Sequence, residues 1–299
     1  MNKKQHSTHD ARRNTQYGFT LVELVVAIGV MAMVVLFAGT VFKASIAAYR
    51  VATAQAEVMQ KFRAITDQLN NDFQGLRKDG YLMLYSTYAG TAPNNFRSDR
   101  LYFFSTGDFQ SWYNSTVRSN IARIYLGHDR TSFTYTVNYW RLVQDINLLT
   151  PGMSGGDYND VNFAWCQVHP TEITNNANAM FLYPPYINTA DSNTLSRLLC
   201  ENAGQFKIEW TDGTIDAGSG AIAWFGFYMQ RSVGSPPDIP ADILYGPIES
   251  YVTGSYYEAT WLPSTPAVLW PTAIKFTFTL YDSHGRNGQT FTHIVYIGD

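Results

Sequence analysis

The sequence predicts an α+β protein, in which one long N-terminal helix precedes a β-rich domain with antiparallel sheet. Three observations predict this. An apolar run covers residues 19–42 and contains one charge. Apolar residues then recur at spacings of three and four up to Leu76, which is typical of one helix face. Beyond Gly80 the apolar runs are short and alternate with Gly, Pro, Asn, Asp and Ser, which is typical of strands and turns.

The apolar run is long enough to cross a membrane as a helix. Its 24 residues exceed the roughly 20 that a bilayer core requires. The polar segment before it carries four Lys and Arg residues and one Asp, and positive charge before a first span predicts that this segment stays in the cytoplasm. We therefore expect a leader peptide over residues 1–18, a membrane-spanning and then packed helix over 19–79, and an extracytoplasmic domain over 80–299.

We expect the helix to run without interruption from about Phe19 to Lys78 and to end near Gly80, since glycine commonly follows a helix C-terminus. Its second half should lie against the β-rich domain. The apolar face is formed by Phe62, Ile65, Leu69, Phe73 and Leu76.

Short aromatic and β-branched runs predict strands in the remainder of the chain. The last two predicted strands are separated by a turn-rich loop, so we expect them to form a hairpin. A loop-rich insertion is expected near residues 150–200. The predicted strands are Leu101–Phe104, Ile121–Leu126, Phe133–Val137, Phe206–Trp210, Ala223–Tyr228, Ala273–Leu280 and Gln289–Ile297.

The junction between Gly18 and Phe19 precedes the apolar run, whereas an ordinary signal peptide is cleaved after its apolar region. With Glu23 five positions beyond Gly18, this arrangement resembles the type IV prepilin family, which includes pilins and the pseudopilins of type II secretion. In that family a membrane peptidase cuts after the glycine and methylates the new N-terminus. The resemblance implies cleavage after Gly18 and methylation of Phe19. The alternative is a plain signal anchor with a chance acidic residue. The matching residues are Gly18, Phe19, Thr20, Leu21, Val22, Glu23 and Leu24–Ile28.

Glu23 is a candidate assembly residue, because a carboxylate within a membrane helix is costly and usually has a partner. The resemblance implies that it pairs with the Phe19 amine of a neighbouring subunit in a filament of packed helices. Such pairing would offset the desolvation of both charges. The alternative is a locally solvated carboxylate near the membrane interface.

The order of segments after the membrane helix resembles the J-type minor pseudopilins of type II secretion. This resemblance implies a single-pass protein of the bacterial inner membrane, with its C-terminal domain in the periplasm and assembled into a pseudopilus. The implied partners are other major and minor pseudopilins, the prepilin peptidase and the inner membrane. Two other classes stay open: a pilin of a surface filament used in adhesion, motility or DNA uptake, and a membrane-anchored binding or enzymatic domain. The matching segments are Phe62–Ile65, Leu69–Phe73, Asp99–Phe104, Ile121–Leu126, Tyr139–Gln144, Phe206–Trp210 and Pro271–Phe276.

Composition and charge point away from nucleic acid. Without the four bases and one acid of the leader, 17 Lys and Arg remain against 23 Asp and Glu, a net charge of −6, and phosphate binding requires clustered cations. The nearest basic group is scattered among acids and aromatics, so a DNA-binding pilin is the weaker alternative. It comprises Arg97, Arg100, Arg118, Arg123 and Arg130.

The sequence predicts no catalytic site, cofactor or metal site. The histidines are isolated along the chain, and no nucleophile is placed between a strand and a helix. Two short acidic stretches, Asp157–Asp160 and Asp212–Asp216, resemble fragments of a calcium loop but lack its full set of alternating ligands. Turn formation explains these Asp and Asn residues more simply.

Cys166 and Cys200 lie in the domain expected outside the cytoplasm, where disulfides form. A bridge between them would close a 35-residue segment and would stabilise the fold by about 3–4 kcal/mol in the chain-entropy model. The alternative is two free buried thiols.

Overall fold

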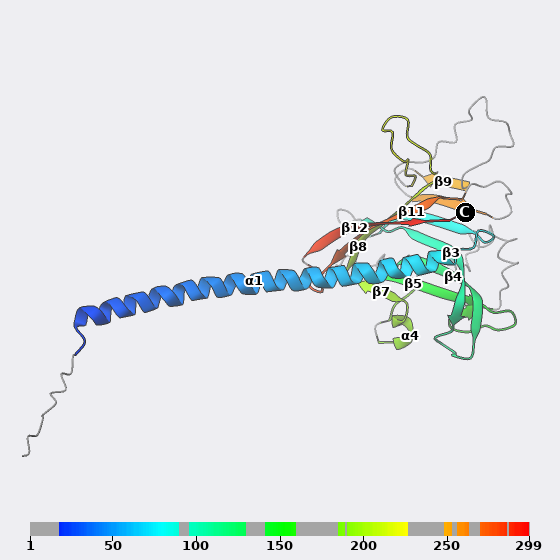
Figure 1. The fold of residues 1–299 in the computed structure, drawn as a ribbon. Helices are drawn as coiled ribbons and strands as arrows, with labels where there is room; N and C mark the ends of the chain where they lie inside the picture. Colours follow the sequence, from blue (N-terminus) through cyan, green and yellow to red (C-terminus); the bar gives the residue numbers. More distant parts are fainter. Residues whose placement is uncertain are drawn as a thin grey trace, which may run out of the picture. The chain divides into compact units, whose positions relative to one another are not determined.

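The computed structural model describes residues 18–89, 96–129, 141–159, 185–188, 190–226, 248–252, 256–262, 270–285 and 287–298. The chain divides into two compact units, residues 1–53 and 54–299. The described part of the first unit consists of residues 18–20 and the N-terminal part of helix α1, whose full bounds are Leu21–Gln74 (Figure 1). The remainder of α1 belongs to the second unit.

The described part of the second unit contains two sheets beside the remainder of α1, and this confirms the predicted α+β fold class. The larger sheet has the strand order β6-β5-β4-β3-β1-β10-β9, with β2 beside β1 and β7 beside β5, and the smaller sheet has the order β12-β11-β8 (Figure 1). Every strand pair is antiparallel except β5 with β6. The strands are β1 (Leu82–Ala89), β2 (Phe96–Arg97), β3 (Arg100–Gln110), β4 (Arg118–His128), β5 (Arg141–Leu149), β6 (Tyr158–Asn159), β7 (Leu198–Glu201), β8 (Ala203–Thr211), β9 (Ile248–Val252), β10 (Tyr256–Trp261), β11 (Ala273–Tyr281) and β12 (Gly288–Tyr296).

The C-terminal hairpin shows why these residues form strands. In β11, buried Ile274, Phe276 and Phe278 alternate with half-buried Lys275 and Thr277, which is the period-two pattern of a strand with one face on a core. Strand β12 pairs with β11 in continuous register from Ala273 opposite Tyr296 to Tyr281 opposite Gly288. The predicted hairpin is therefore confirmed.

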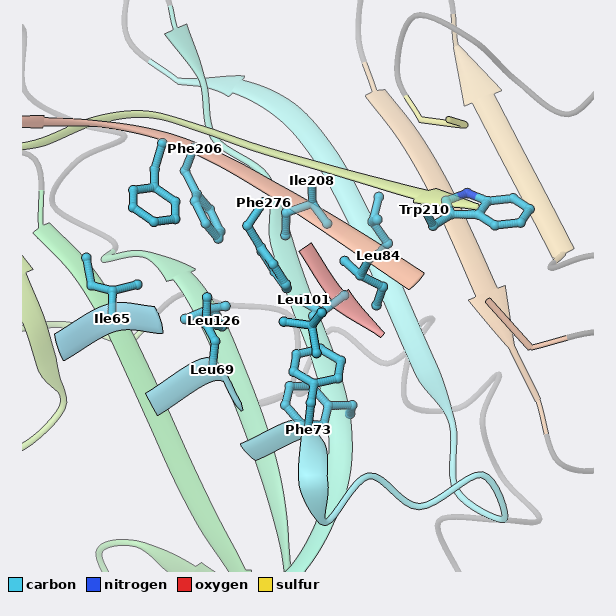
Figure 2. Close-up of a cluster of buried hydrophobic side chains, with 14 of the residues drawn as sticks. Ile65, Leu69, Phe73, Leu84, Leu101, Leu126, Phe206, Ile208, Trp210 and Phe276 are labelled. Carbon is cyan, nitrogen blue, oxygen red and sulfur yellow. The ribbon is translucent and has the colours of Figure 1, made fainter. Parts of the chain in front are cut away.

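The apolar face of α1 in the second unit packs against both sheets. Val58, Ile65, Leu69 and Phe73 are buried, and they share one core with side chains of the larger sheet and of the smaller sheet (Figure 2). The prediction that this part of the helix lies against the β-rich domain is thus confirmed. From the larger sheet the core includes Leu84, Leu101, Phe103, Ile124 and Leu126, and from the smaller sheet Phe206, Ile208, Trp210, Ile274, Phe276 and Phe278.

The helix ends at Gln74 rather than near Lys78, because the next residues pair with β3. The backbone N–H of Thr106 donates to the carbonyl of Gly75 at 2.7 Å, and the N–H of Arg77 donates to the carbonyl of Phe104 at 2.9 Å. A side chain at position 75 would overlap the Thr106 carbonyl oxygen and the Ser105 hydroxyl. Glycine therefore permits the close approach of helix end and strand.

Two other expectations have different outcomes. The segment 223–226 forms no strand, and Phe225 makes only an isolated antiparallel bridge to Trp210. Its neighbour Trp224 covers the ammonium group of Lys275 instead, with 4.4 Å between Nζ and the ring centroid. The predicted strand Phe133–Val137 lies outside the described residues. Within the expected insertion, the described residues form β6, the short helix α4 (Ser192–Leu195) and the start of β7.

Buried polar groups join the two sheets near the start of β3. Asp99 receives a bidentate contact from Arg97, with 2.9 Å from Nε and 2.6 Å from Nη2, and it accepts the backbone N–H of Ile208 in β8 at 2.7 Å. His128 at the end of β4 lies 2.8 Å from both the Ser98 hydroxyl and the Gly204 carbonyl. Since a carbonyl only accepts, Nε2 of His128 carries the proton and Nδ1 accepts from Ser98. Burial lowers the pKa of His128 to about 4, which keeps the ring neutral.

A buried carboxylate lies where α1 meets the larger sheet. Asp72 accepts a hydrogen bond from the side-chain amide of Gln68 at 2.8 Å and another from the amide of Gln144 in β5. Burial raises the pKa of Asp72 to about 7. The two groups that donate hydrogen bonds to the Asp72 carboxylate are neutral amides, so neither offers a positive charge to its ionised form.

Gly75→Ala should destabilise the second unit, because the added methyl group displaces backbone atoms of β3. The expected loss in the free energy of unfolding is about 1–3 kcal/mol, the usual range for overpacking. Gly39→Ala is the matched control, because nothing lies within 4 Å of a side chain built there. Thermal unfolding in detergent measures both, and equal melting temperatures for the two variants would contradict the proposed contact.

Asp72→Asn should change how stability depends on pH. The folded pKa of Asp72 lies above its unfolded value, so the protonated form stabilises the fold at low pH and this stabilisation is lost as pH rises from about 4 through about 7. Asparagine does not ionise, so it removes that loss. The side-chain amide of Gln68 or Gln144 can rotate so that its oxygen accepts the asparagine N–H. We expect the variant to gain on the order of a few kcal/mol relative to wild type between pH 4 and pH 8. Denaturant unfolding at several pH values checks this, and a stability difference that is constant with pH would refute it.

Candidate functional site

The residues around the predicted cleavage junction lie at the start of α1. Gly18, Phe19 and Thr20 precede the helix in a non-helical, exposed segment, and the first intrahelical hydrogen bond runs from the N–H of Leu24 to the carbonyl of Thr20 at 3.2 Å. Thr20 is therefore the N-cap residue, and Glu23 occupies the third helical position.

Thr20 and Glu23 form a capping box. The Glu23 carboxylate accepts the Thr20 backbone N–H and the Thr20 hydroxyl, both at 2.9 Å, and the N–H of Glu23 approaches the Thr20 hydroxyl oxygen at 3.3 Å. Such a reciprocal arrangement satisfies backbone N–H groups that have no partner inside the helix. A carboxylate in the first turn also complements the positive end of the helix dipole. This capping box fixes the start of the helix at Thr20.

The capping role of Thr20 was not predicted from the sequence, where the expected environment of Glu23 was either a neighbouring subunit's amine or local solvation. A Ser or Thr followed three residues later by Glu, just before an apolar run, is itself a signature of a helix start. That pattern is present in Thr20-Leu21-Val22-Glu23. Glu23 consequently has a hydrogen-bonding partner within its own chain.

The Gly18–Phe19 peptide bond is accessible in the folded chain. Nothing lies within 4 Å of a side chain built at Gly18, and Phe19 is 86% exposed. The bond lies in the non-helical segment immediately before the capping box, so a protease can approach it without melting the helix. Among the described residues, packing does not require glycine at position 18.

The apolar side chains that follow are exposed along the N-terminal part of α1. Among them Leu36, Phe37 and Phe42 are each more than two-thirds exposed. The helix is long and apolar enough to cross a membrane, and its most apolar stretch has no buried residue. Exposed apolar surface of this extent requires a cover such as lipid or neighbouring helices.

The other candidate residues lie in the second unit. Cys200 in β7 is buried, and burial raises the pKa of its thiol to about 12. Its predicted partner Cys166 lies outside the described residues, so the disulfide stays a prediction.

The acidic residues accept hydrogen bonds within turns and between loops. Asp157 is buried and accepts from the Ser111 hydroxyl at 2.5 Å and the Trp112 N–H at 2.9 Å, which ties the β3–β4 loop to β6. Asp216 accepts from the backbone of Gly218 and from both the backbone and the hydroxyl of Ser219. Groups of His, Cys, Asp or Glu that could hold a metal are not found in the part of the chain that the structure describes. Asp160 lies outside that part.

The scattered arginines do not gather into one exposed group where they are described. Arg97 and Arg123 are buried, and Arg97 is engaged with Asp99. Arg118 is exposed and lies 3.6 Å from Asp108. Arg130 lies outside the described residues.

Comparison with known protein families supports the N-terminal assignment. Residues 13–39 match the prokaryotic N-terminal methylation motif, a match that includes Gly18, Phe19, Thr20 and Glu23. The N-terminal segment is therefore that of a type IV prepilin-like protein, and its apolar helix suits membrane anchoring. No curated protein and no solved structure matches the chain.

Gly18→Val should leave the precursor uncut while the protein folds and inserts normally. The valine side chain meets open space in this chain, so a failure of cleavage would report recognition by the peptidase. Mass spectrometry of the N-terminus measures the result, and wild type should begin at a methylated Phe19. Gly29→Val, a site equally open but outside the junction, is the control and should be cut. A mature protein that begins after residue 42 would contradict the prepilin assignment.

Proposed function

We propose that this protein is a structural minor pseudopilin of the J type in a type II secretion pseudopilus, cleaved by prepilin peptidase and N-methylated, and that it is not an enzyme. One observation carries the proposal. The methylation motif over residues 13–39 coincides with an accessible Gly18–Phe19 bond immediately before a helix that is capped by Thr20 and Glu23.

Cleavage after Gly18 would create an ammonium group on Phe19, one residue before the N-cap. Within its own chain the Glu23 carboxylate is held by the N–H and hydroxyl of Thr20. In a filament, the Phe19 ammonium of a neighbouring subunit would offer a charged donor in place of these neutral ones, and hydrogen bonds between charged groups are the stronger kind. Assembly would therefore involve an exchange of partners at Glu23.

The second unit is consistent with a structural subunit. Its core is built around α1 residues between Val58 and Phe73, so this part of the helix and the sheets form one folded body. The J-type assignment is supported by the order of segments from Phe62 to Phe276 in the sequence. In the cell we place the helix in the inner membrane, this domain in the periplasm and other major and minor pseudopilins around it.

A pilin of a surface filament is the second candidate, since the same methylation motif favours it equally. Genes for a secretion ATPase and an outer-membrane secretin beside this gene would favour the pseudopilus, whereas pilus retraction genes would favour the surface filament. A pull-down from native membranes that identifies the co-purifying pilin-like chains separates the two directly.

Glu23→Leu should be processed and inserted normally but should enter the filament complex poorly. The Phe19 ammonium of its neighbour would lose its partner, while cleavage depends on Gly18 and the leader. The measurements are co-purification with partner pilins and secretion in a strain that carries only the variant.

Glu23→Gln separates the charge from the helix cap, because glutamine also serves in a capping box. We expect it to assemble as poorly as Glu23→Leu. Thr20→Ala keeps the carboxylate and removes the cap, and should assemble better than either. If Glu23→Gln co-purifies and secretes like wild type, Glu23 acts only as a capping residue and the proposed pairing is wrong.

A further inference from the structure

Strand β12 forms one edge of the smaller sheet (Figure 1). It runs over nine residues in unbroken register with β11, and in the described structure no other strand pairs with it. Its sequence contains no proline and no Lys, Arg, Asp or Glu. Natural edge strands are usually protected by such residues, by bulges or by being short.

The hydrogen-bond pattern shows which residues face the open edge. Backbone hydrogen bonds join the two segments at both ends of the hairpin. They run from the Ile297 N–H to the Thr272 carbonyl at 2.9 Å and from the Asp282 N–H to the Asn287 carbonyl at 3.3 Å. Bonded and non-bonded pairs alternate along an antiparallel ladder. Counting from either end of the hairpin therefore gives the same β12 residues as hydrogen-bonded to β11. The alternate residues therefore direct their N–H and C=O groups outward. These are Gly288, Thr290, Thr292, Ile294 and Tyr296.

The same alternate residues place their side chains on the face of the sheet away from α1. Tyr296 is 78% exposed, and Thr290 and Thr292 are exposed as well. On the opposite face, Phe291 stacks on Phe62 of α1 with 4.5 Å between ring centroids, and His293 Nε2 lies 2.9 Å from the side-chain oxygen of Asn70. The histidine of the strand is thus turned toward the helix, and the open edge carries no Lys, Arg, Asp, Glu or His.

We propose that β12 is a homotypic interface, at which β12 of a second copy of this chain adds antiparallel and joins the two smaller sheets into one. Addition of a strand to an open edge is a common mode of recognition. A second copy fits this edge because the outward residues are self-complementary about Thr292.

Antiparallel pairing centred on Thr292 gives favourable partners at every outward position. Thr292 lies opposite its own copy, Thr290 opposite Ile294, and Gly288 opposite Tyr296. Threonine pairs and β-branched pairs stabilise neighbouring strands, and an aromatic ring across from glycine covers backbone that would otherwise be exposed. No like charges meet, since the strand has none at this edge.

This interface is independent of the proposed role of Glu23, which belongs to the other unit. A strand pair alone buries less than the roughly 1,000 Å² typical of stable interfaces, so we expect a weak dimer in dilute detergent. Anchoring in a membrane raises the effective concentration of the copies and favours pairing.

Cysteine cross-linking of the full-length protein in membranes tests the proposal. Directly opposed residues in a bonded antiparallel pair have Cα atoms about 5.5 Å apart, within the range of a disulfide. Thr292→Cys should give, under mild oxidation, a species of twice the chain mass at a level several-fold above wild type, which retains its natural cysteines. Thr277→Cys is the matched control, because Thr277 lies beside Thr292 on β11, one strand further from the edge.

The register provides a second measurement. A mixture of Thr290→Cys and Ile294→Cys chains should cross-link more than either variant alone. Adding Thr292→Lys to both should abolish this, because two ammonium groups would then meet at the centre, while the exposed position leaves the fold intact. Glu23→Leu should leave the cross-link unchanged.

Three results would overturn the proposal. Equal cross-linking at positions 277 and 292 would indicate random collision. Strong cross-linking of Thr290→Cys alone would indicate a different register. A Thr292→Cys adduct whose mass is not twice that of the chain would show that a different protein occupies the edge.

Discussion

The apolar face of α1 between Val58 and Phe73 is the element on which the second unit depends, because it serves as core for both sheets. Phe73 stacks on Phe103 of β3 with 4.7 Å between ring centroids and meets the edge of Phe276 of β11 at 5.8 Å. Phe62 contacts both strands of the C-terminal hairpin. Each sheet therefore buries its inner face only when the helix is in place, and loss of the helix face would expose both at once.

Polar groups add specificity to this shared core. A buried ion pair contributes little net stability, because desolvation opposes the attraction between its charges. The Asp99 carboxylate, paired with Arg97, also accepts the Ile208 N–H, and His128 bonds to Ser98 and Gly204. Each group fixes one sheet against the other at a defined register. Apolar packing alone would allow the sheets to slide, whereas these contacts are satisfied in one arrangement.

The sequence predicted the features that depend on local pattern. The continuous helix, the β11–β12 hairpin and the methylation motif follow from periodicity and from a pattern of a few residues. The end of the helix at Gln74 could not be predicted, since it depends on β3 approaching Gly75. The prediction of a strand at Trp224 was wrong. An aromatic run in the sequence does not show whether its side chains belong to a strand or cover a neighbouring side chain, as Trp224 covers Lys275. The burial of Arg97 likewise depends on its neighbour Asp99 and on β8. Strand β8 lies more than a hundred positions further along the chain, and its Ile208 N–H bonds to Asp99. The capping role of Thr20 was readable from sequence and was overlooked.

The strand order has a consequence for how the chain folds as it is made. The smaller sheet combines β8 with a hairpin at the far C-terminal end of the chain, while the helix that both sheets cover is synthesised near the beginning. Contacts between such distant segments form slowly, and apolar surface stays exposed until they do. The helix face is thus among the first parts to be synthesised and the last to be covered. Completion of the fold waits for the final strand, so a chain shortened by only its last residues would leave the core open and would be a natural target for proteases.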